Sequence, residues 1–185
     1  IIETCIDIQE MRAALLAAKE AAPKIPVICQ LSYSEDGRTV TGTDPQSAAV
    51  ILAAMGADII GVNCSLGPEQ LVPIVKTLAE NCQVPISVQP NAGMPYLDNG
   101  ETKFPMGAVE FGTWGRKLVE AGASFLGGCC GTTPEHIKEL AKNVKNLAEP
   151  VRHNTKQQLM LASRSKTVVI DKDLPTRLIG ERINP

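Results

Sequence analysis

The chain has 185 residues, of which 44% are hydrophobic and 21% charged, an ordinary balance for one globular domain. Aromatic residues make up only 3%, so Ala, Val, Ile and Leu must build the core, which favours layered α/β packing. The net charge of -2 and the lack of a basic stripe give no indication of a nucleic-acid partner. No apolar run approaches the ~18 residues of a membrane span and no secretory signal is recognisable, so a soluble, cytoplasmic protein is expected.

Apolar and amphipathic segments alternate up to about residue 148. Nearly continuous apolar runs, typical of strands buried on both faces, predict strands at residues 1–3, 25–32, 57–63, 84–89 and 123–128. Amphipathic patterns predict helices at residues 8–21, 43–56, 68–81, 108–121 and 133–147. Two of these helices begin with a capping residue followed by proline, at Asp44-Pro45 and Thr133-Pro134.

Successive β-α units of this kind predict a parallel α/β sheet with right-handed crossovers. An open doubly wound sheet and a closed (β/α)8 TIM-type barrel both fit the order. No G-x-G-x-x-G dinucleotide fingerprint follows a strand, and reactive residues stand just past several strand ends, so we favour the barrel. Only the later five βα units would then be present, with the earlier three expected before Ile1, where the chain starts in mid-strand without Met.

The alternation stops near residue 148. Residues 149–166 are interpreted as a polar linker with some helix. Thr167–Ile170 and Arg177–Ile183 are predicted strands around a turn at Asp171–Pro175, and residues 167–185 are interpreted as the start of a second domain.

The chain contains six cysteines, and its length and lack of a signal peptide favour metal binding, catalysis or burial over disulfides. Cys64 follows the predicted strand 57–63, and Cys129 and Cys130 follow the predicted strand 123–128. At one rim of a barrel, three thiolates can meet at about 2.3 Å from a zinc ion and leave the fourth position open, as in catalytic zinc sites. Spacing alone leaves two alternatives open, namely buried free thiols and a strained vicinal disulfide between Cys129 and Cys130.

Three motifs resemble the homocysteine S-methyltransferase domain: G-V-N-C-S-L-G-P at 61–68, P-N-A-G-M-P at 90–95 and G-G-C-C-G-T-T-P-E-H-I at 127–137. The likeness runs from Ile1 to about residue 148. The terminal I-G-E-R-I-N-P at 179–185 resembles the start of the pterin-binding barrel that follows this domain in cobalamin-dependent methionine synthases.

The resemblance implies that residues 1–148 are the C-terminal portion of a homocysteine-binding (β/α)8 barrel, with Zn²⁺ held by Cys64, Cys129 and Cys130. It also implies that Glu3 helps to bind the substrate amino group and that Asn91 lines the pocket. From the residues alone, Glu3 is no more than a strand-end carboxylate and Asn91 could be a turn former.

The implied function is zinc-dependent methyl transfer to the thiol of homocysteine, giving methionine. Methylcobalamin would donate the methyl group and methyltetrahydrofolate would restore it, both bound by the cobalamin-binding and pterin-binding domains of the same polypeptide outside this chain. Because the strand that helps to bind the substrate carboxylate in relatives would precede Ile1, the chain alone is expected to be inactive. Two alternatives stay open: a thiol methyltransferase that uses betaine or S-methylmethionine, and a non-catalytic zinc-binding fragment.

Overall fold

A five-stranded parallel sheet forms the centre of the computed structural model, which describes residues 1–150 and 158–176. Its strands are β1 (Ile2–Cys5), β2 (Ile28–Leu31), β3 (Ile59–Asn63), β4 (Ile86–Gln89) and β7 (Ala123–Leu126). They lie side by side in the order β1-β2-β3-β4-β7, so each connection steps in the same direction across the sheet. Within the described residues, β1 and β7 are the two edges.

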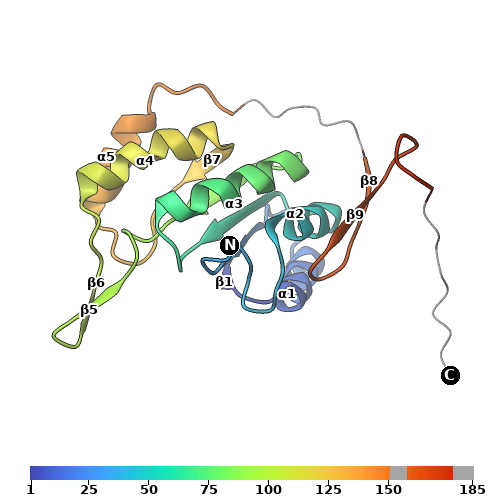
Figure 1. Cartoon of the computed structure of the whole chain (residues 1–185), viewed down its shortest axis with the longest axis horizontal. Coiled ribbons are helices and arrows are strands. Elements are labelled where there is room, and N and C mark those ends of the chain that lie inside the picture. The colour runs from blue at the N-terminus through green and yellow to red at the C-terminus, as the bar shows by residue number, and fades with distance from the viewer. Residues whose placement is uncertain (151–157, 177–185) are drawn as a thin grey trace.

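Five helices connect or follow these strands, and Figure 1 shows α2 and α3 lying along the sheet. They are α1 (Ile8–Ala21), α2 (Pro45–Ala54), α3 (Pro68–Asn81), α4 (Ala108–Glu120) and α5 (Pro134–Val144). Right-handed crossovers that all step the same way place the connecting helices on one face of the sheet. No helix in the described ranges has the length and apolar character needed to cross a lipid bilayer.

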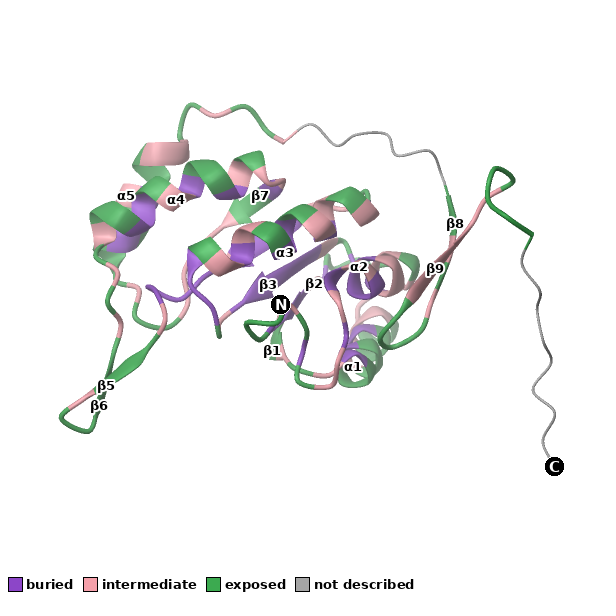
Figure 2. Ribbon diagram, viewed as in Figure 1, coloured by how far each residue is buried: buried purple, intermediate pink, exposed green. Residues whose placement is uncertain are grey.

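The apolar core lies between that face and the helices. Cys29, Ile60 and Ile86 stand in register on β2, β3 and β4, and all three are fully buried. They pack in one cluster with apolar side chains of α1 to α4, such as Met11 and Leu78. Burial is therefore concentrated in the central strands and on the inner sides of the helices, as Figure 2 shows.

The opposite face of the sheet is polar at its centre. Gln30, Gly61 and Ser87 stand in register, and Gln30 Nε2 donates to Ser87 Oγ over a distance of 2.9 Å across Gly61. A Cβ atom at Gly61 would lie 2.0 Å from the Ser87 carbonyl oxygen, so no larger residue fits there. On the edge strand β7, Phe125 is 48% exposed, so this face is open on the β7 side.

The structure confirms the five predicted parallel strands and the five predicted helices, but three strands begin two or three residues later than expected. β2 begins at Ile28, β3 at Ile59 and β4 at Ile86, whereas the predicted strands begin at residues 25, 57 and 84. Pro26 and Pro85 lie among the residues that were predicted to belong to these strands but precede β2 and β4. Proline has no N–H group that could hydrogen-bond to a neighbouring strand. The N–H of Val27 instead donates to the side chain of Asp58.

A hairpin between β4 and α4 was not predicted. Its strands are β5 (Tyr96–Asp98) and β6 (Glu101–Lys103), and Figure 1 shows it projecting from the rest of the molecule. Asn99 and Gly100 form the two-residue turn, with φ angles of 51° and 83°. Asn-Gly is the strongest short-range signal for such a turn, so the sequence contained the information.

A second hairpin follows the α/β unit. It consists of β8 (Leu159–Ala162) and β9 (Thr167–Ile170), so the strand expected at 167–170 is confirmed while β8 lies inside the predicted linker. The hairpin lies beside α2, where Ser47 Oγ and Thr167 Oγ1 are 3.1 Å apart. The predicted strand Arg177–Ile183 and residues 151–157 of the linker lie outside the described residues.

Candidate metal centre

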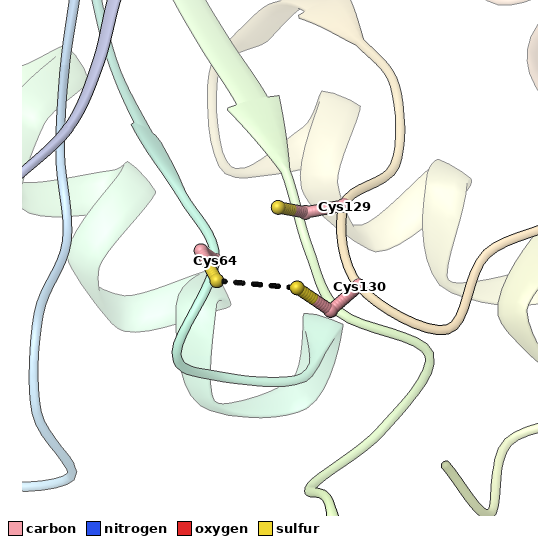
Figure 3. Close-up of side chains that lie close together, drawn as sticks. All are labelled: Cys64, Cys129 and Cys130. Atoms are coloured by element: carbon pink, nitrogen blue, oxygen red, sulfur yellow. Dashed lines mark hydrogen bonds between the residues drawn. The ribbon is translucent and has the colours of Figure 1, made fainter. Parts of the chain in front are cut away.

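The three cysteines singled out by the sequence come together at the carboxyl end of the sheet. Cys64 directly follows β3, while Cys129 and Cys130 follow β7, and β4 lies between these two strands. Their sulfur atoms all lie within 4.8 Å of one another. Figure 3 shows the side chains of Cys64 and Cys130 pointing toward each other, with their sulfurs 3.7 Å apart.

Backbone hydrogen bonds with the last residue of β4 and the residues that follow it hold the two cysteine segments in place. The N–H of Cys64 donates to the Gln89 carbonyl at 3.0 Å, and the N–H of Cys129 donates to the Pro90 carbonyl at 2.8 Å. The N–H of Ala92 in turn donates to the Cys130 carbonyl at 2.9 Å. Residues 89–92 therefore serve as a common support for cysteines that are 65 or more positions apart in the chain.

Unfavourable backbone conformations are concentrated at this edge of the sheet. Only four non-glycine residues in the described part of the chain have positive φ, and three of them are Thr4, Cys64 and Ser65, with φ near 60°. Such conformations are uncommon for residues with a Cβ atom and cluster at functional sites. The left-handed turn at Cys64 and Ser65 ends β3 and is closed by the N–H of Leu66 donating to the Cys64 carbonyl at 2.7 Å.

Gly131 lets the cysteine loop pass close to the segment before α4. A Cβ atom there would lie 2.2 Å from the ring of Phe104, and the φ angle of Gly131 is 77°. His136 also connects the start of α5 to the segment before α4. Its Nε2 lies 2.9 Å from the Met106 carbonyl oxygen, and its Nδ1 accepts from the Thr133 N–H. Since it is 8% exposed and engaged at both nitrogens, His136 anchors α5 and does not face the sulfurs.

Cys129 and Cys130 favour the neutral form of their thiols. Burial, followed by the nearby Cys64 thiol, raises the pKa of Cys129 to about 12. The hydrogen bond with Cys64, followed by burial, raises the pKa of Cys130. All six cysteines are free in the structure, so the vicinal Cys129–Cys130 disulfide is not formed. Neutral thiols can approach one another closely, and a bound cation would be needed to deprotonate them at neutral pH.

The donor set fits a zinc ion. For zinc–sulfur bonds of about 2.3 Å, tetrahedral geometry places the sulfurs about 3.8 Å apart. The separation of 3.7 Å between Cys64 and Cys130 already matches this value, and Cys129 lies within 4.8 Å of both. Three soft sulfur donors with one position left over are typical of catalytic zinc sites.

The other two predicted residues have different surroundings. Asn91 is 3% exposed, and its Oδ1 accepts from the N–H of Cys130 at 3.1 Å, so it binds the cysteine loop directly. Glu3 is exposed on β1, next to Thr4, whose N–H donates to the side chain of Asn63. The structure thus places Asn91 in contact with the cysteine loop. Glu3 was predicted to end its strand, but β1 continues to Cys5, so Glu3 lies within β1, beside the residue that Asn63 binds.

The sequence comparison identifies the family. Residues 1–144 match the profile of the family described as homocysteine S-methyltransferase. The chain belongs to the homocysteine S-methyltransferase family. The three cysteines, Asn91 and Glu3 all lie within the matched part.

Curated relatives of this chain include two mycobacterial proteins named methionine synthase. The methionine synthase of Mycobacterium tuberculosis (strain ATCC 25618 / H37Rv) is 32% identical over 189 residues, and that of Mycobacterium leprae (strain TN) is 30% identical over 194 residues. Each alignment covers 100% of this chain, which spans 16% of the length of either relative.

Solved structures with the same fold include the homocysteine methyltransferase MmuM from Escherichia coli. Its apo form matches with a TM-score of 0.61 and 22% identity, over 76% of this chain and 47% of that chain. Its metallated form matches with a TM-score of 0.56 and 22% identity, over 72% of this chain and 40% of that chain. At 22% identity, the likeness shows that this chain and MmuM share a fold.

Sequence reasoning missed one residue of this site. Asn63 is 1% exposed, and its side chain touches both Thr4 and the sulfur of Cys129. It stands in the motif G-V-N-C directly before Cys64, and a buried asparagine at the end of a strand is a polar side chain that needs partners. The burial of Asn63 could be predicted from its place at the end of an apolar strand, but its contacts with Thr4 and Cys129 could not.

Proposed function

We propose that this chain is the homocysteine-binding part of a methionine synthase and that Cys64, Cys129 and Cys130 hold Zn²⁺ for methyl transfer to the homocysteine thiol. The main support is the convergence of three sulfurs from two strand ends within 4.8 Å in a chain of the homocysteine S-methyltransferase family. The names of the two mycobacterial relatives support methionine as the product.

The chemistry begins with the cysteines of this chain. Their raised pKa values mean that Cys129 and Cys130 give up protons when the cation enters. A zinc ion bound by them would supply a Lewis acid that keeps a substrate thiol deprotonated at neutral pH. Since the protein supplies three sulfurs, the homocysteine sulfur can be the fourth donor, and Cys130 lies on the exposed side where a substrate enters.

The overall transfer forms one bond and breaks two. The homocysteine sulfur forms a bond to the methyl carbon, the bond between that carbon and its donor breaks with its electron pair left on the donor, and the S–H bond breaks as the thiol proton passes to solvent. We propose methylcobalamin as the donor and methyltetrahydrofolate as the source that restores it, both bound by other domains of a longer polypeptide. The chain spans 16% of its methionine synthase relatives, which leaves room for such domains in them.

Two residues of this chain are proposed to orient the substrate. Glu3 is exposed within β1, and its carboxylate can pair with a substrate ammonium group. Asn91 uses its Oδ1 atom to hold the Cys130 N–H, so its Nδ2 amide is proposed to face the substrate. These roles place the charged group of the substrate toward β1 and its sulfur toward the cysteines.

We also propose that the sheet is part of a (β/α)8 barrel. Sequential strand order with same-direction crossovers supports this closure, since a doubly wound sheet reverses its order at a switch point. Residues 1–148 would be the later five units of this barrel, 149–166 a linker and 167–185 the start of a pterin-binding domain. The family match, which ends at residue 144, is consistent with the first boundary.

Metal analysis of the intact polypeptide tests the proposal. We expect about one zinc per chain, and loss of most of it after Cys64→Ser, Cys129→Ser or Cys130→Ser, because three protein ligands are needed to hold the ion. Cys82→Ser is the matched control, since Cys82 lies at the end of α3 and its sulfur contacts the Leu78 carbonyl instead of the cluster. Zinc content that is unaffected by all three substitutions would contradict the proposal.

A donor assay separates the proposed reaction from its nearest alternative. The fold that the chain shares with MmuM, a homocysteine methyltransferase, is the observation that favours a single-donor enzyme as the alternative. Methionine formation from homocysteine with methylcobalamin, but not with betaine or S-methylmethionine, is the expected result. Turnover with either of the last two donors alone would assign the chain to the single-donor type.

A further inference from the structure

Asn63 connects the end of β1 to the cysteine loop through one buried carboxamide group. Its Oδ1 accepts from the N–H of Thr4 at 2.8 Å, and its Nδ2 donates to Thr4 Oγ1 at 2.7 Å. The same Nδ2 lies 4.0 Å from the sulfur of Cys129, at the long limit of an N–H···S contact. One side chain that is 1% exposed therefore contacts two segments, 59 and 66 positions away in the sequence.

Thr4 needs this contact to keep its conformation. Its φ angle is 61°, which is a genuine outlier for a β-branched residue. The pairing of β1 with β2 shifts register between Ile2 and Cys5, so Thr4 lies in the irregular part of the ladder. Asn63 accepts from the main chain of Thr4 and donates to its side chain, and this paired contact fixes the end of β1 next to Glu3.

Asn63 Nδ2 carries a second hydrogen, and the sulfur of Cys129 lies 4.0 Å from this nitrogen. An amide N–H beside a thiolate stabilises the negative charge and orients the sulfur, as supporting groups around metal ligands commonly do. An amide is the suitable group here because it both donates and accepts, whereas an ionised carboxylate only accepts. Asparagine at the end of β3 can therefore interact with all three neighbouring atoms, namely Thr4 N, Thr4 Oγ1 and Cys129 Sγ.

We propose that Asn63 is a positioning residue that holds the Cys129 sulfur and the Glu3–Thr4 segment of β1 in fixed relation before metal and substrate arrive. This inference rests on the proposed function, because it assigns Asn63 to the support of the zinc ligands. Groups that are ordered in advance do not have to be ordered when the ligand binds, so affinity increases.

Three variants of the intact polypeptide separate positioning from simple folding. Asn63→Ala removes the contacts to Thr4 and to Cys129. Asn63→Asp retains the Thr4 contacts, since the Thr4 hydroxyl can rotate to donate, but removes the N–H directed at the sulfur. Ser32→Ala is the control, because Ser32 Oγ donates to the backbone carbonyl of Asn63 at 2.8 Å and touches none of the other atoms.

The measurements are the zinc dissociation constant, by competition with a chromophoric chelator, and the sulfur-to-cobalt charge-transfer band of the Co²⁺-loaded protein. We expect Asn63→Ala to weaken zinc binding by about 10-fold or more, and Ser32→Ala to change it by less than about 3-fold. In Asn63→Asp the band should move to longer wavelength, because a sulfur without its N–H donor releases electrons to the metal more easily.

Zinc affinity in Asn63→Ala within about 2-fold of the unsubstituted protein would overturn the inference, as would an unchanged band in Asn63→Asp. If Asn63→Ala does not fold, the band of Asn63→Asp decides the question. An unsubstituted protein that binds no zinc would remove both this inference and the proposed function, whereas normal zinc binding with unaffected variants would remove this inference alone.

Discussion

The sulfur atoms of Cys64 and Cys130 lie 3.7 Å apart, although 66 positions separate the two residues in the chain. This separation is close to the edge of a tetrahedral zinc–thiolate site, about 3.8 Å. The supporting hydrogen bonds come from residues 89–92, at the end of β4 and just after it, which bind the backbone of all three cysteines. The candidate site is thus held by the main chain before any ion is bound.

Zinc affinity should rise steeply with pH. The pKa of Cys129 is raised to about 12 and that of Cys130 is also raised, so both thiols are protonated in the metal-free protein at neutral pH. Each must lose its proton on binding, so raising the pH lowers the cost of binding. Two displaced protons predict an affinity gain of at least ~100-fold per pH unit between about pH 6 and 8. Proton release measured with an indicator dye during zinc titration checks this, and pH-independent affinity would contradict it.

The cysteines should differ in their reactivity toward iodoacetamide. Cys130 is exposed, whereas Cys29 is fully buried and burial raises its pKa to about 11. We expect Cys130 to be alkylated in the native metal-free protein and Cys29 only after unfolding, because the thiolate is the reactive form and must be accessible. Peptide mass spectrometry at successive times measures the order. Added zinc should protect Cys130 and leave Cys29 unchanged, and equal rates for the two thiols would refute the assignment.

Asn91 should support zinc binding through its oxygen atom. Asn91→Ala removes the acceptor for the Cys130 N–H and should weaken zinc binding by roughly 10- to 100-fold, as for other groups that orient metal ligands. Asn91→Asp keeps an oxygen acceptor and should retain most of the affinity. Chelator competition measures both variants. Similar losses in the two variants would show that the acceptor oxygen is not what matters.

Gly61→Ala should destabilise the fold without a direct effect on the cysteines. The new Cβ would lie 2.0 Å from the Ser87 carbonyl oxygen, so β3 and β4 would have to separate, at a cost of about 3 kcal/mol in the free energy of unfolding. Gly37→Ala is the comparison, because its φ of 74° carries a conformational cost but no atom lies within 4 Å, and about 1 kcal/mol is expected. Urea denaturation measures both, and equal losses would exclude the steric explanation.

Local sequence patterns predicted much of this protein, because the elements are encoded by short-range signals. Asp44 and Pro45 placed the start of α2, since the Asp44 side chain accepts from the Ser47 N–H as a capping residue does. The β5–β6 hairpin was missed even though its turn carries the Asn-Gly signal, because its strands are only three residues long and lack apolar alternation. The position of Cys64 and Cys129 just past strand ends was also predictable from hydrophobic periodicity.

The sequence by itself therefore determined the order of strands and helices, the placement of three thiols at strand ends and the family to which the motifs belong. Only the tertiary structure decided how closely the sulfurs of Cys64, Cys129 and Cys130 approach, and that Asn63 and Asn91 bind their surroundings. Strand and helix patterns depend on neighbouring residues, whereas these distances depend on strand register and on left-handed backbone angles at Thr4 and Cys64. Such angles are unfavourable locally and persist because contacts between distant segments hold them.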